Sequence, residues 1–330
     1  MSYQSVEDIF QQFDQLKALI IGDVMVDAYI WGNVDRISPE APVPVVSVSK
    51  RDYRLGGAAN VALNIQALGA TPILCALIGQ DEGGERFKER LSGRDITFDG
   101  IIASSERPTT VKTRIISDYH HIVRIDEEVT EALSELEEQK LWQKIEDLLP
   151  QADVVIFEDY NKGVLTETII HKSVELANSL NIPTVVDPKK TNFLSFKNTT
   201  LFKPNLKELK EGLKIEFNVG EQDDIEYAVK TLIEELHCKG VLATLSEKGV
   251  FIQKNDEKHL ISAHRREISD VSGAGDTVIS IAALCTALDL PAFLIAALSN
   301  LGGGLVCEYV GVVPIDKNEL LIEAQKQNWL

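Results

Sequence analysis

Residues 270–288 read DVSGAGDTVISIAALCTAL, a glycine-rich loop followed at once by a long apolar run. A loop of this kind that opens a helix leaves backbone N–H groups unpaired at the positive end of the helix dipole. Because such an end binds anions, the stretch predicts a phosphate site. Asp276 falls in the first turn, where the helix dipole favours the ionised carboxylate, so it could accept a proton from a hydroxyl that attacks phosphorus.

Other interpretations of this loop are open to test against the sequence. A Walker A loop needs a Lys directly after its last glycine, and Asp276 stands there instead. A dinucleotide fingerprint needs a third small residue where Val278 stands and an acidic residue about 20 positions later, where the chain is apolar, so a nicotinamide oxidoreductase is disfavoured. A plain capped helix with Asp276 as an N-terminal charge remains as the structural alternative.

Outside this loop, short β-rich apolar runs alternate with amphipathic helical patterns over most of the 330 residues. That alternation is typical of βαβ units on a parallel sheet, so the chain predicts a single α/β domain over residues 1–330. Apolar residues recur at helical spacing at 170–177 and 225–236. Buried strands are expected at 18–24, 73–78, 154–157, 184–186 and 241–244.

Two stretches, 28–54 and 100–126, break this alternation. They contain no helical period but do contain strand-like runs at 43–48 and 111–116. We expect them to form one small β-sheet that acts as a lid where the strands of the main sheet end. Ordinary surface hairpins are the alternative.

The charge balance limits the partners. The chain carries 33 Lys and Arg against 51 Asp and Glu, a formal net charge of −18, so nucleic acid is excluded as an expected partner. The four cysteines include no C-x-x-C pair and predict reduced thiols, and the acidic N-terminus lacks a signal-peptide core. The apolar stretch 278–306 is interrupted by polar residues and glycines, so we do not expect it to span a membrane. A cytoplasmic protein is expected.

A second constellation lies near the N-terminus. Asp27 follows the first strand, and the run GGAAN at 56–60 enters a helix with Asn60 in its first turn. A carboxylate accepts hydrogen bonds and an amide both donates and accepts them, so the pair suits the hydroxyls of a polyol. A turn Asp and a helix-capping Asn are the structural alternative.

Four further motifs each follow a predicted strand, at 158–163, 187–189, 203–208 and 244–249. They could therefore face one edge of the sheet. Lys162 and Lys189 are the natural local cations for a phosphorylated ligand on so acidic a protein. Asn205 and Glu208 lie one helical turn apart and could position water bound to Mg²⁺, which would itself be held mainly by nucleotide phosphates.

Taken together, these residues resemble the ribokinase-like (PfkB) carbohydrate kinase family over essentially the whole chain. The resemblance rests on GGAAN at 56–60, on KPN-x-x-E at 203–208 and on DVSGAGDT at 270–277. Three shorter segments resemble the D-glycero-β-D-manno-heptose 7-phosphate kinase subfamily more closely. They are WG at 31–32, RISPEAPVPV at 36–45 and DY-x-KG at 159–163.

The resemblance implies a three-layer fold, a mainly parallel sheet flanked by helices with a small β-lid, and the use of ATP and Mg²⁺. It makes Asp276 the catalytic base and the N–H groups of Gly273, Ala274 and Gly275 the anion hole. The positions that match sugar-hydroxyl contacts are Asp27, Gly56, Gly57 and Asn60. The positions that match the ATP and Mg²⁺ side are Asn205, Glu208, Ser246, Gly249 and Asn300, with Glu208 acting on Mg²⁺ through water. Asp270 and Ser272 match the loop through which some members bind a monovalent cation such as K⁺.

For a heptose 7-phosphate, the resemblance implies phosphorylation at O1 to the 1,7-bisphosphate, a step towards ADP-heptose and the lipopolysaccharide core. Lys162 and Lys189 are the candidates for the 7-phosphate. No H-x-G-H motif follows the kinase signature, so a stand-alone kinase with a separate phosphatase and nucleotidyltransferase is expected. A homodimer through the lid, at the apolar run 43–48, is also expected. The alternatives are a PfkB kinase for another sugar, sugar phosphate or nucleoside, and a non-catalytic sugar-phosphate sensor.

Overall fold

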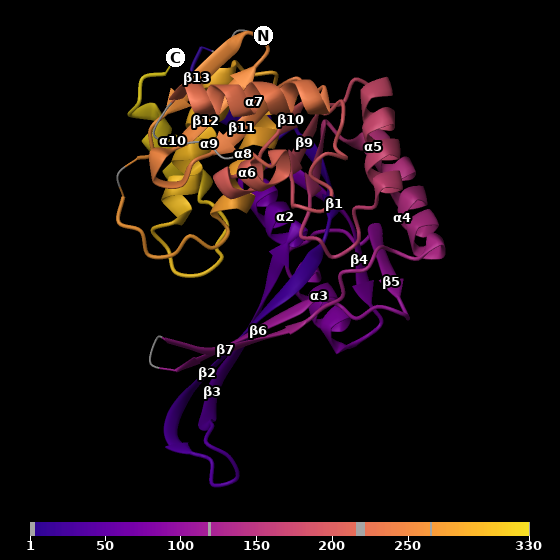
Figure 1. Cartoon of the computed structure of the whole chain (residues 1–330), viewed down its shortest axis with the longest axis vertical. Helices are drawn as coiled ribbons and strands as arrows, with labels where there is room; N and C mark the ends of the chain where they lie inside the picture. The colour runs from indigo at the N-terminus through magenta and orange to yellow at the C-terminus, as the bar shows by residue number, and fades with distance from the viewer. Residues whose placement is uncertain (1–3, 118–119, 216–221, 265, 330) are drawn as a thin grey trace.

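Two β-sheets organise the chain in the computed structural model, which describes all residues except 1–3, 118–119, 216–221, 265 and 330 (Figure 1). In chain order, the elements are α1 (Val6–Phe13), β1 (Lys17–Gly22), β2 (Val24–Ile37), β3 (Pro44–Gly57), α2 (Ala58–Ala67), β4 (Thr71–Gly79), α3 (Glu82–Ser92), β5 (Gly100–Ser104), β6 (Val111–Ser117), β7 (His120–Glu127), α4 (Glu135–Leu148), η1 (Leu149–Gln151), β8 (Val154–Glu158), α5 (Glu167–Ser179), β9 (Thr184–Asp187), β10 (Leu201–Phe202), α6 (Leu206–Leu213), α7 (Gln222–Leu236), β11 (Gly240–Thr244), η2 (Ser246–Lys248), β12 (Val250–Lys254), β13 (Glu257–Ile261), α8 (Ala274–Ala287), α9 (Ala292–Val306) and α10 (Lys317–Gln325).

The larger sheet has the strand order β13-β12-β11-β10-β9-β8-β1-β4-β5. Its strands pair in parallel except at one edge, where β12 is antiparallel to both β11 and β13. The predicted mainly parallel sheet is therefore confirmed. The five predicted strands correspond to β1, β4, β8, β9 and β11, with ends displaced by no more than about two residues, the scatter usual for strand boundaries.

Helices cover both faces of this sheet because its strands are apolar on both faces. In β1, Ala18 and Ile20 join the core cluster that also contains residues of α2, α8 and α9. The alternate residues Leu19 and Ile21 join the cluster formed with α4, α5 and α7. This period of two places one hydrophobic core on each side of the sheet and gives the predicted three-layer architecture.

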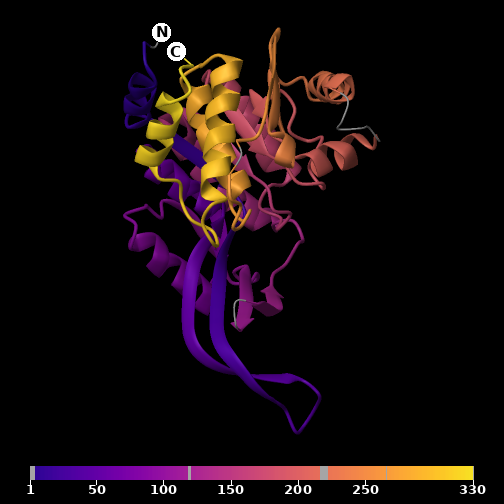
Figure 2. The same ribbon diagram turned by 90° about the vertical axis from the view of Figure 1, so that its left-hand side faces the viewer.

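The second sheet, which we call the lid sheet, has the order β3-β2-β6-β7. Its longest part is the antiparallel hairpin of β2 and β3, which extends away from the helical body (Figures 1 and 2). Both stretches expected to build a lid contribute strands to it, although residues 100–104 do not. They form β5 at the edge of the large sheet, where Gly100 packs so closely on β4 that a Cβ would lie 2.4 Å from the Leu74 carbonyl oxygen.

Cys75, Cys238, Cys285 and Cys307 are all free thiols, and the first three are buried. In the part of the chain that the structure describes, no helix combines the length and the hydropathy that a membrane span requires.

Candidate active site

The loop 270–277 meets the carboxyl ends of the large-sheet strands at Asp276. Helix α8 begins directly after Gly273, which adopts a positive φ of 82° as its N-cap residue, as the sequence predicts for a glycine-rich helix entry. Asp276 is buried in the first turn and accepts hydrogen bonds from Asn60 Nδ2 at 2.6 Å and from the Tyr160 hydroxyl at 3.0 Å. The structure thus joins the two glycine-rich motifs of the sequence through one carboxylate.

The surroundings of Asp276 change its acidity. Burial raises the pKa of its carboxyl to about 6, the hydrogen bond from Asn60 opposes that rise, and the charge of nearby Asp187 adds to it. The carboxyl is therefore mostly ionised at neutral pH, yet it binds a proton more readily than an exposed Asp. These are the properties that a general base needs.

The sugar-side motif is built at the root of the lid sheet. Strand pairing places Gly56 opposite Met25 and next to Asp27, so closely that a Cβ at Gly56 would lie 2.3 Å from Asp27 Oδ2. Gly57 has a positive φ of 60°, and a Cβ there would lie 2.4 Å from the Asp23 carbonyl oxygen. The two glycines are required by this close packing, which sets Asn60 in the first turn of α2.

A cleft of about 770 Å³ opens beside Asp276. Its walls come from the loops after β8, β9, β10 and β11 and from the start of α8. The residues that line it include Tyr160, Asp187, Lys189, Lys203, Asn205, Lys207, Lys210, Ser246, Gly273 and Gly275. A cleft of this volume, lined by several lysines and by the N-terminus of α8, suits a polyphosphate.

The predicted nucleotide-side residues divide into two groups. Asn205 and Ser246 line the cleft, whereas Glu208, Gly249 and Asn300 are not among its lining residues. Asn205 and Glu208 form the capping box of α6, with Glu208 N donating to Asn205 Oδ1 at 2.9 Å and Asn205 N donating to Glu208 Oε2 at 2.8 Å. The remaining Glu208 oxygen lies 3.0 Å from Lys189 Nζ. Their proposed contacts with ATP and Mg²⁺ stay a prediction.

Several predicted site residues make hydrogen bonds within the protein, and their functional roles stay predictions. Asn300 donates to the Ser262 carbonyl at 2.8 Å, and the Ala274 N–H of the expected anion hole donates to the Val271 carbonyl at 3.3 Å. Asp270 accepts from the backbone N–H groups of Ser272 and Gly311, each at 2.9 Å. The carboxylate of Asp270 therefore fixes the loop that was expected to hold a monovalent cation.

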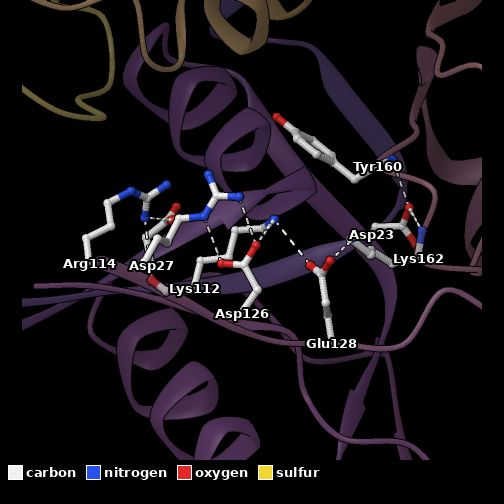
Figure 3. A network of polar contacts seen from close by, with 9 residues as sticks. Asp23, Asp27, Lys112, Arg114, Asp126, Glu128, Tyr160 and Lys162 are labelled. Atoms are coloured by element: carbon white, nitrogen blue, oxygen red, sulfur yellow. Dashed lines mark hydrogen bonds and ion pairs between the residues drawn. The ribbon is translucent and has the colours of Figure 1, made fainter. Parts of the chain in front are cut away.

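Lys162 and Lys189 have different partners. The Lys162 ammonium lies 2.7 Å from Glu128 Oε1 at the lid sheet (Figure 3). The Lys189 ammonium lies 3.3 Å from Asp187 and 3.0 Å from Glu208 in the cleft. Burial alone would lower the pKa of Lys189, but the carboxylates of Asp187 and Glu208 raise it. Lys189 is thus a fixed cation at the wall of the cleft.

A buried ion pair joins Asp187, at the end of β9, to Lys203, which directly follows β10. Lys203 Nζ lies 2.8 Å from Asp187 Oδ2, and both side chains are about 95% or more buried, at 3% and 5% exposure. Burial would lower the pKa of Lys203, but Asp187 and Glu208 raise it. Lys203 therefore keeps its charge at the wall of the cleft.

Sequence reasoning gave no role to three residues that shape the site. Tyr160 donates to Asp276, and Asp23 accepts the backbone N–H groups of Tyr160, Lys162 and Val164 at 2.8, 3.0 and 3.1 Å. Glu158, at the end of β8, is fully buried, and neither of its carboxyl oxygens has a hydrogen-bond partner among the described residues. Burial, reinforced by Asp187 and Asp276, raises the pKa of Glu158 well above its usual range. The signal for Tyr160 was its place in the segment 158–163 directly after a buried strand.

The described residues contain no group of three or more His, Cys, Asp or Glu side chains that could hold a metal ion. Mg²⁺ in nucleotide sites takes one or two carboxylates together with substrate phosphates and water. Asp187 at the cleft and Glu208 next to it supply oxygen donors of that kind, so the residues present fit a nucleotide-bound Mg²⁺.

Comparison with known proteins covers nearly all of the chain. The model of the pfkB family carbohydrate kinases matches residues 15–317. The bifunctional protein HldE of Syntrophotalea carbinolica is 34% identical over 322 residues, which are 97% of this chain and 65% of that protein. HldE of Koribacter versatilis is 38% identical over 303 residues, 92% of this chain and 62% of that protein. The chain thus spans a little less than two thirds of the length of these relatives.

Solved structures show the same fold. Phosphofructokinase-2 from Escherichia coli in complex with potassium superposes with a TM-score of 0.76 at 17% identity, covering 94% of this chain and 99% of that one. Arabidopsis thaliana ribokinase complexed with ribose and ATP gives a TM-score of 0.72 at 16% identity, again covering 94% and 99%. At these identities the likeness is one of fold.

Proposed function

This chain belongs to the pfkB family of carbohydrate kinases and is an ATP-dependent sugar kinase, and we propose that it phosphorylates a heptose 7-phosphate at O1. The observation that carries the proposal is the buried Asp276, held by Asn60 and Tyr160 beside the cleft. The relatives named HldE and the segments 31–32, 36–45 and 159–163 support a heptose phosphate as the acceptor.

The chemistry follows from the groups around Asp276. Its carboxylate accepts the proton of the anomeric hydroxyl as O1 forms a bond to the γ-phosphorus of ATP and the bond from that phosphorus to the β,γ-bridging oxygen breaks, which releases ADP. The N–H groups of Gly273, Ala274 and Gly275 stabilise the charge on the transferring phosphoryl group. Asp27 and Asn60 hold the sugar hydroxyls. Because an anomeric hydroxyl is more acidic than an ordinary alcohol, a carboxylate suffices as the base.

Mg²⁺ bound to the ATP phosphates would neutralise their charge, with Asp187 and Glu208 nearby. The product would be a 1,7-bisphosphate. A phosphatase that removes the 7-phosphate and a nucleotidyltransferase that acts on the remaining anomeric phosphate would consume it, and we propose this place for the chain in a reaction sequence.

The position of phosphorylation is tested by the product. Incubation with Mg²⁺-ATP and D-glycero-β-D-manno-heptose 7-phosphate is expected to yield a second phosphorus resonance coupled to the anomeric proton in ³¹P and ¹H NMR. A new phosphate on any other carbon would contradict the assignment of O1, although it would leave the kinase activity in place.

We also propose that the chain forms a homodimer through the lid sheet. Apolar side chains are exposed on this sheet, including Val48 at 47%, Val123 at 47% and Ile125 at 48%, and in the loop between β2 and β3, where Val43 is 52% exposed. Exposed apolar side chains gathered on one projecting sheet favour association. Light scattering after size-exclusion chromatography is expected to give twice the chain mass, and Val48→Lys is expected to shift the protein towards the monomer. A monomer mass for the wild type at working concentration would exclude the dimer.

A further inference from the structure

The lid sheet has one face that is charged. Strand register places Asp27 of β2, Lys112 of β6 and Asp126 of β7 side by side, and it places Arg114 of β6 opposite Arg124 of β7. Because side chains two residues apart in a strand point to the same face, all five side chains share one face of the sheet. Figure 3 shows Arg114, Asp27, Lys112 and Asp126 in a row that leads to Lys162 in the loop after β8.

Ion pairs connect much of this row: Arg114 pairs with Asp27, and a chain of pairs runs from Arg124 through Asp126, Lys112 and Glu128 to Lys162. Lys112 Nζ lies 3.2 Å from Glu128 Oε2 and 3.7 Å from Asp126 Oδ2. Lys162 Nζ lies 2.7 Å from the other oxygen of Glu128, so two ammonium groups flank one carboxylate (Figure 3). The lid sheet and the loop after β8 therefore bring their lysines to one point, although the two lie 50 positions apart in the sequence.

This row gathers four cationic side chains. Its cations are Arg114, Lys112, Arg124 and Lys162, and the carboxyl groups beside them belong to Asp27, Asp126 and Glu128, with Asp23 next to Lys162. The chain as a whole has a net charge of −18. A cluster of four cations on so acidic a protein points to an anionic ligand at this place.

Arg114 has unused capacity to bind an anion. Its Nη1 forms the ion pair with Asp27, the predicted sugar contact, and its guanidinium carbon lies 5.3 Å from the Tyr29 ring centre. Among the residues that the structure describes, none accepts a hydrogen bond from its Nε or Nη2. A planar guanidinium with free N–H groups suits the oxygens of a phosphate ester.

Lys112 and Arg114 are partly shielded from water without being closed off. Their side chains are 17% and 20% exposed, and that of Lys162 is 14% exposed. Charges in such a position interact with a ligand more strongly than fully solvated ones, yet a ligand can still reach them. Lys189, by contrast, is held in the nucleotide cleft by Asp187 and Glu208.

We propose that Lys112 and Arg114 of β6, together with Lys162, hold the phosphate ester of the sugar acceptor. The inference rests on the proposed function, and it assigns the acceptor phosphate to the lid sheet instead of to Lys189. The sugar would then extend from this row, past Asp27, to Asp276, with its reacting hydroxyl at one end and its phosphate at the other. The kinase would select phosphorylated over unphosphorylated sugars by charge.

The test compares Lys112→Met with wild type on heptose 7-phosphate and on the same heptose without its phosphate. Loss of one charge-assisted hydrogen bond is expected to raise the KM for the phosphorylated sugar about 10- to 100-fold with little change in kcat. The kcat/KM for the unphosphorylated sugar is expected to stay within about twofold, and Lys112→Arg is expected to recover most of the affinity. Lys50→Met is the matched control, because Lys50 lies farther out on the lid sheet, over the Trp31 ring.

The outcomes separate this inference from the proposed function. If the wild type phosphorylates heptose 7-phosphate and Lys112→Met leaves its KM unchanged, the inference is wrong and the function stands. If both sugars lose turnover equally in Lys112→Met while Lys112→Arg fails to restore it, Lys112 supports the lid structurally and the inference is again wrong. If the wild type phosphorylates no sugar phosphate, the proposed function and the inference both fail.

Discussion

Asp276→Asn is expected to lower kcat by about 10²- to 10⁴-fold, the usual contribution of a general base, while the KM for ATP changes little. The substitution keeps the shape of the side chain, with its amide oxygen able to accept from Asn60 and its amide N–H able to donate to the Tyr160 hydroxyl oxygen, but it removes the group that takes the proton. Steady-state kinetics with the acceptor saturating measures the effect. A variant as active as the wild type would remove Asp276 from the mechanism.

The pH dependence provides a second readout of the same residue. Because burial raises the pKa of Asp276 to about 6, the kcat of the wild type is expected to fall as the pH drops below about 6, towards tenfold per unit. The folded protein binds this proton more tightly than the unfolded chain, in which an Asp has a pKa of about 3.9. Ionised Asp276 therefore lowers the free energy of unfolding above pH 6, and this cost shrinks as the pH drops from about 6 towards about 3.9. At pH 8, Asp276→Asn is therefore expected to melt no lower than the wild type. A variant that is inactive because it is unfolded would contradict this.

Lys203→Met is expected to lower the free energy of unfolding by about 3 kcal/mol. The substitution leaves the buried carboxylate of Asp187 without its 2.8 Å partner, and an uncompensated buried charge is costly. The remaining contact from Lys189, at 3.3 Å, offsets only part of this loss. Urea unfolding followed by circular dichroism measures the difference.

Two controls make that result specific. Lys207→Met removes a lysine whose side chain is 81% exposed on α6, and it is expected to change stability by less than about 0.5 kcal/mol. In the double variant with Asp187→Asn, the loss is expected to be smaller than the sum of the two single losses, because the unpaired charge is gone. Additive losses, or a loss below about 1 kcal/mol in Lys203→Met, would show that the pair contributes little.

Elements with a clear local pattern were predictable from sequence. The alternation in β1 of Ala18 and Ile20 with Leu19 and Ile21, and the glycine-rich entry to α8, depend on neighbours within a few residues. The capping box of α6 follows from the spacing of Asn205 and Glu208, which the sequence placed one helical turn apart. The expectation that residues 100–104 belong to the lid is wrong, because five residues without a distinctive period do not reveal which sheet they join, and β5 pairs with β4.

The contacts that complete the site could not be derived in this way. Tyr160 reaches Asp276 across 116 positions of sequence, and Arg114 reaches Asp27 across 87. No periodicity encodes such pairs, because they result from how the lid sheet and the large sheet pack together. The same holds for Lys162 and Lys112, which meet only through Glu128. Sequence patterns supplied the candidate residues, and the fold decided which of them became neighbours.

The most direct test of a heptose 7-phosphate kinase is ADP release from Mg²⁺-ATP with a panel of acceptors. The panel contains D-glycero-β-D-manno-heptose 7-phosphate, fructose 6-phosphate, fructose 1-phosphate, ribose and adenosine. Strong turnover with the heptose phosphate alone is the expected result. Preferred turnover of another acceptor would contradict the proposed substrate, and no turnover with any of them would contradict the account of Asp276 as the base of a working sugar kinase.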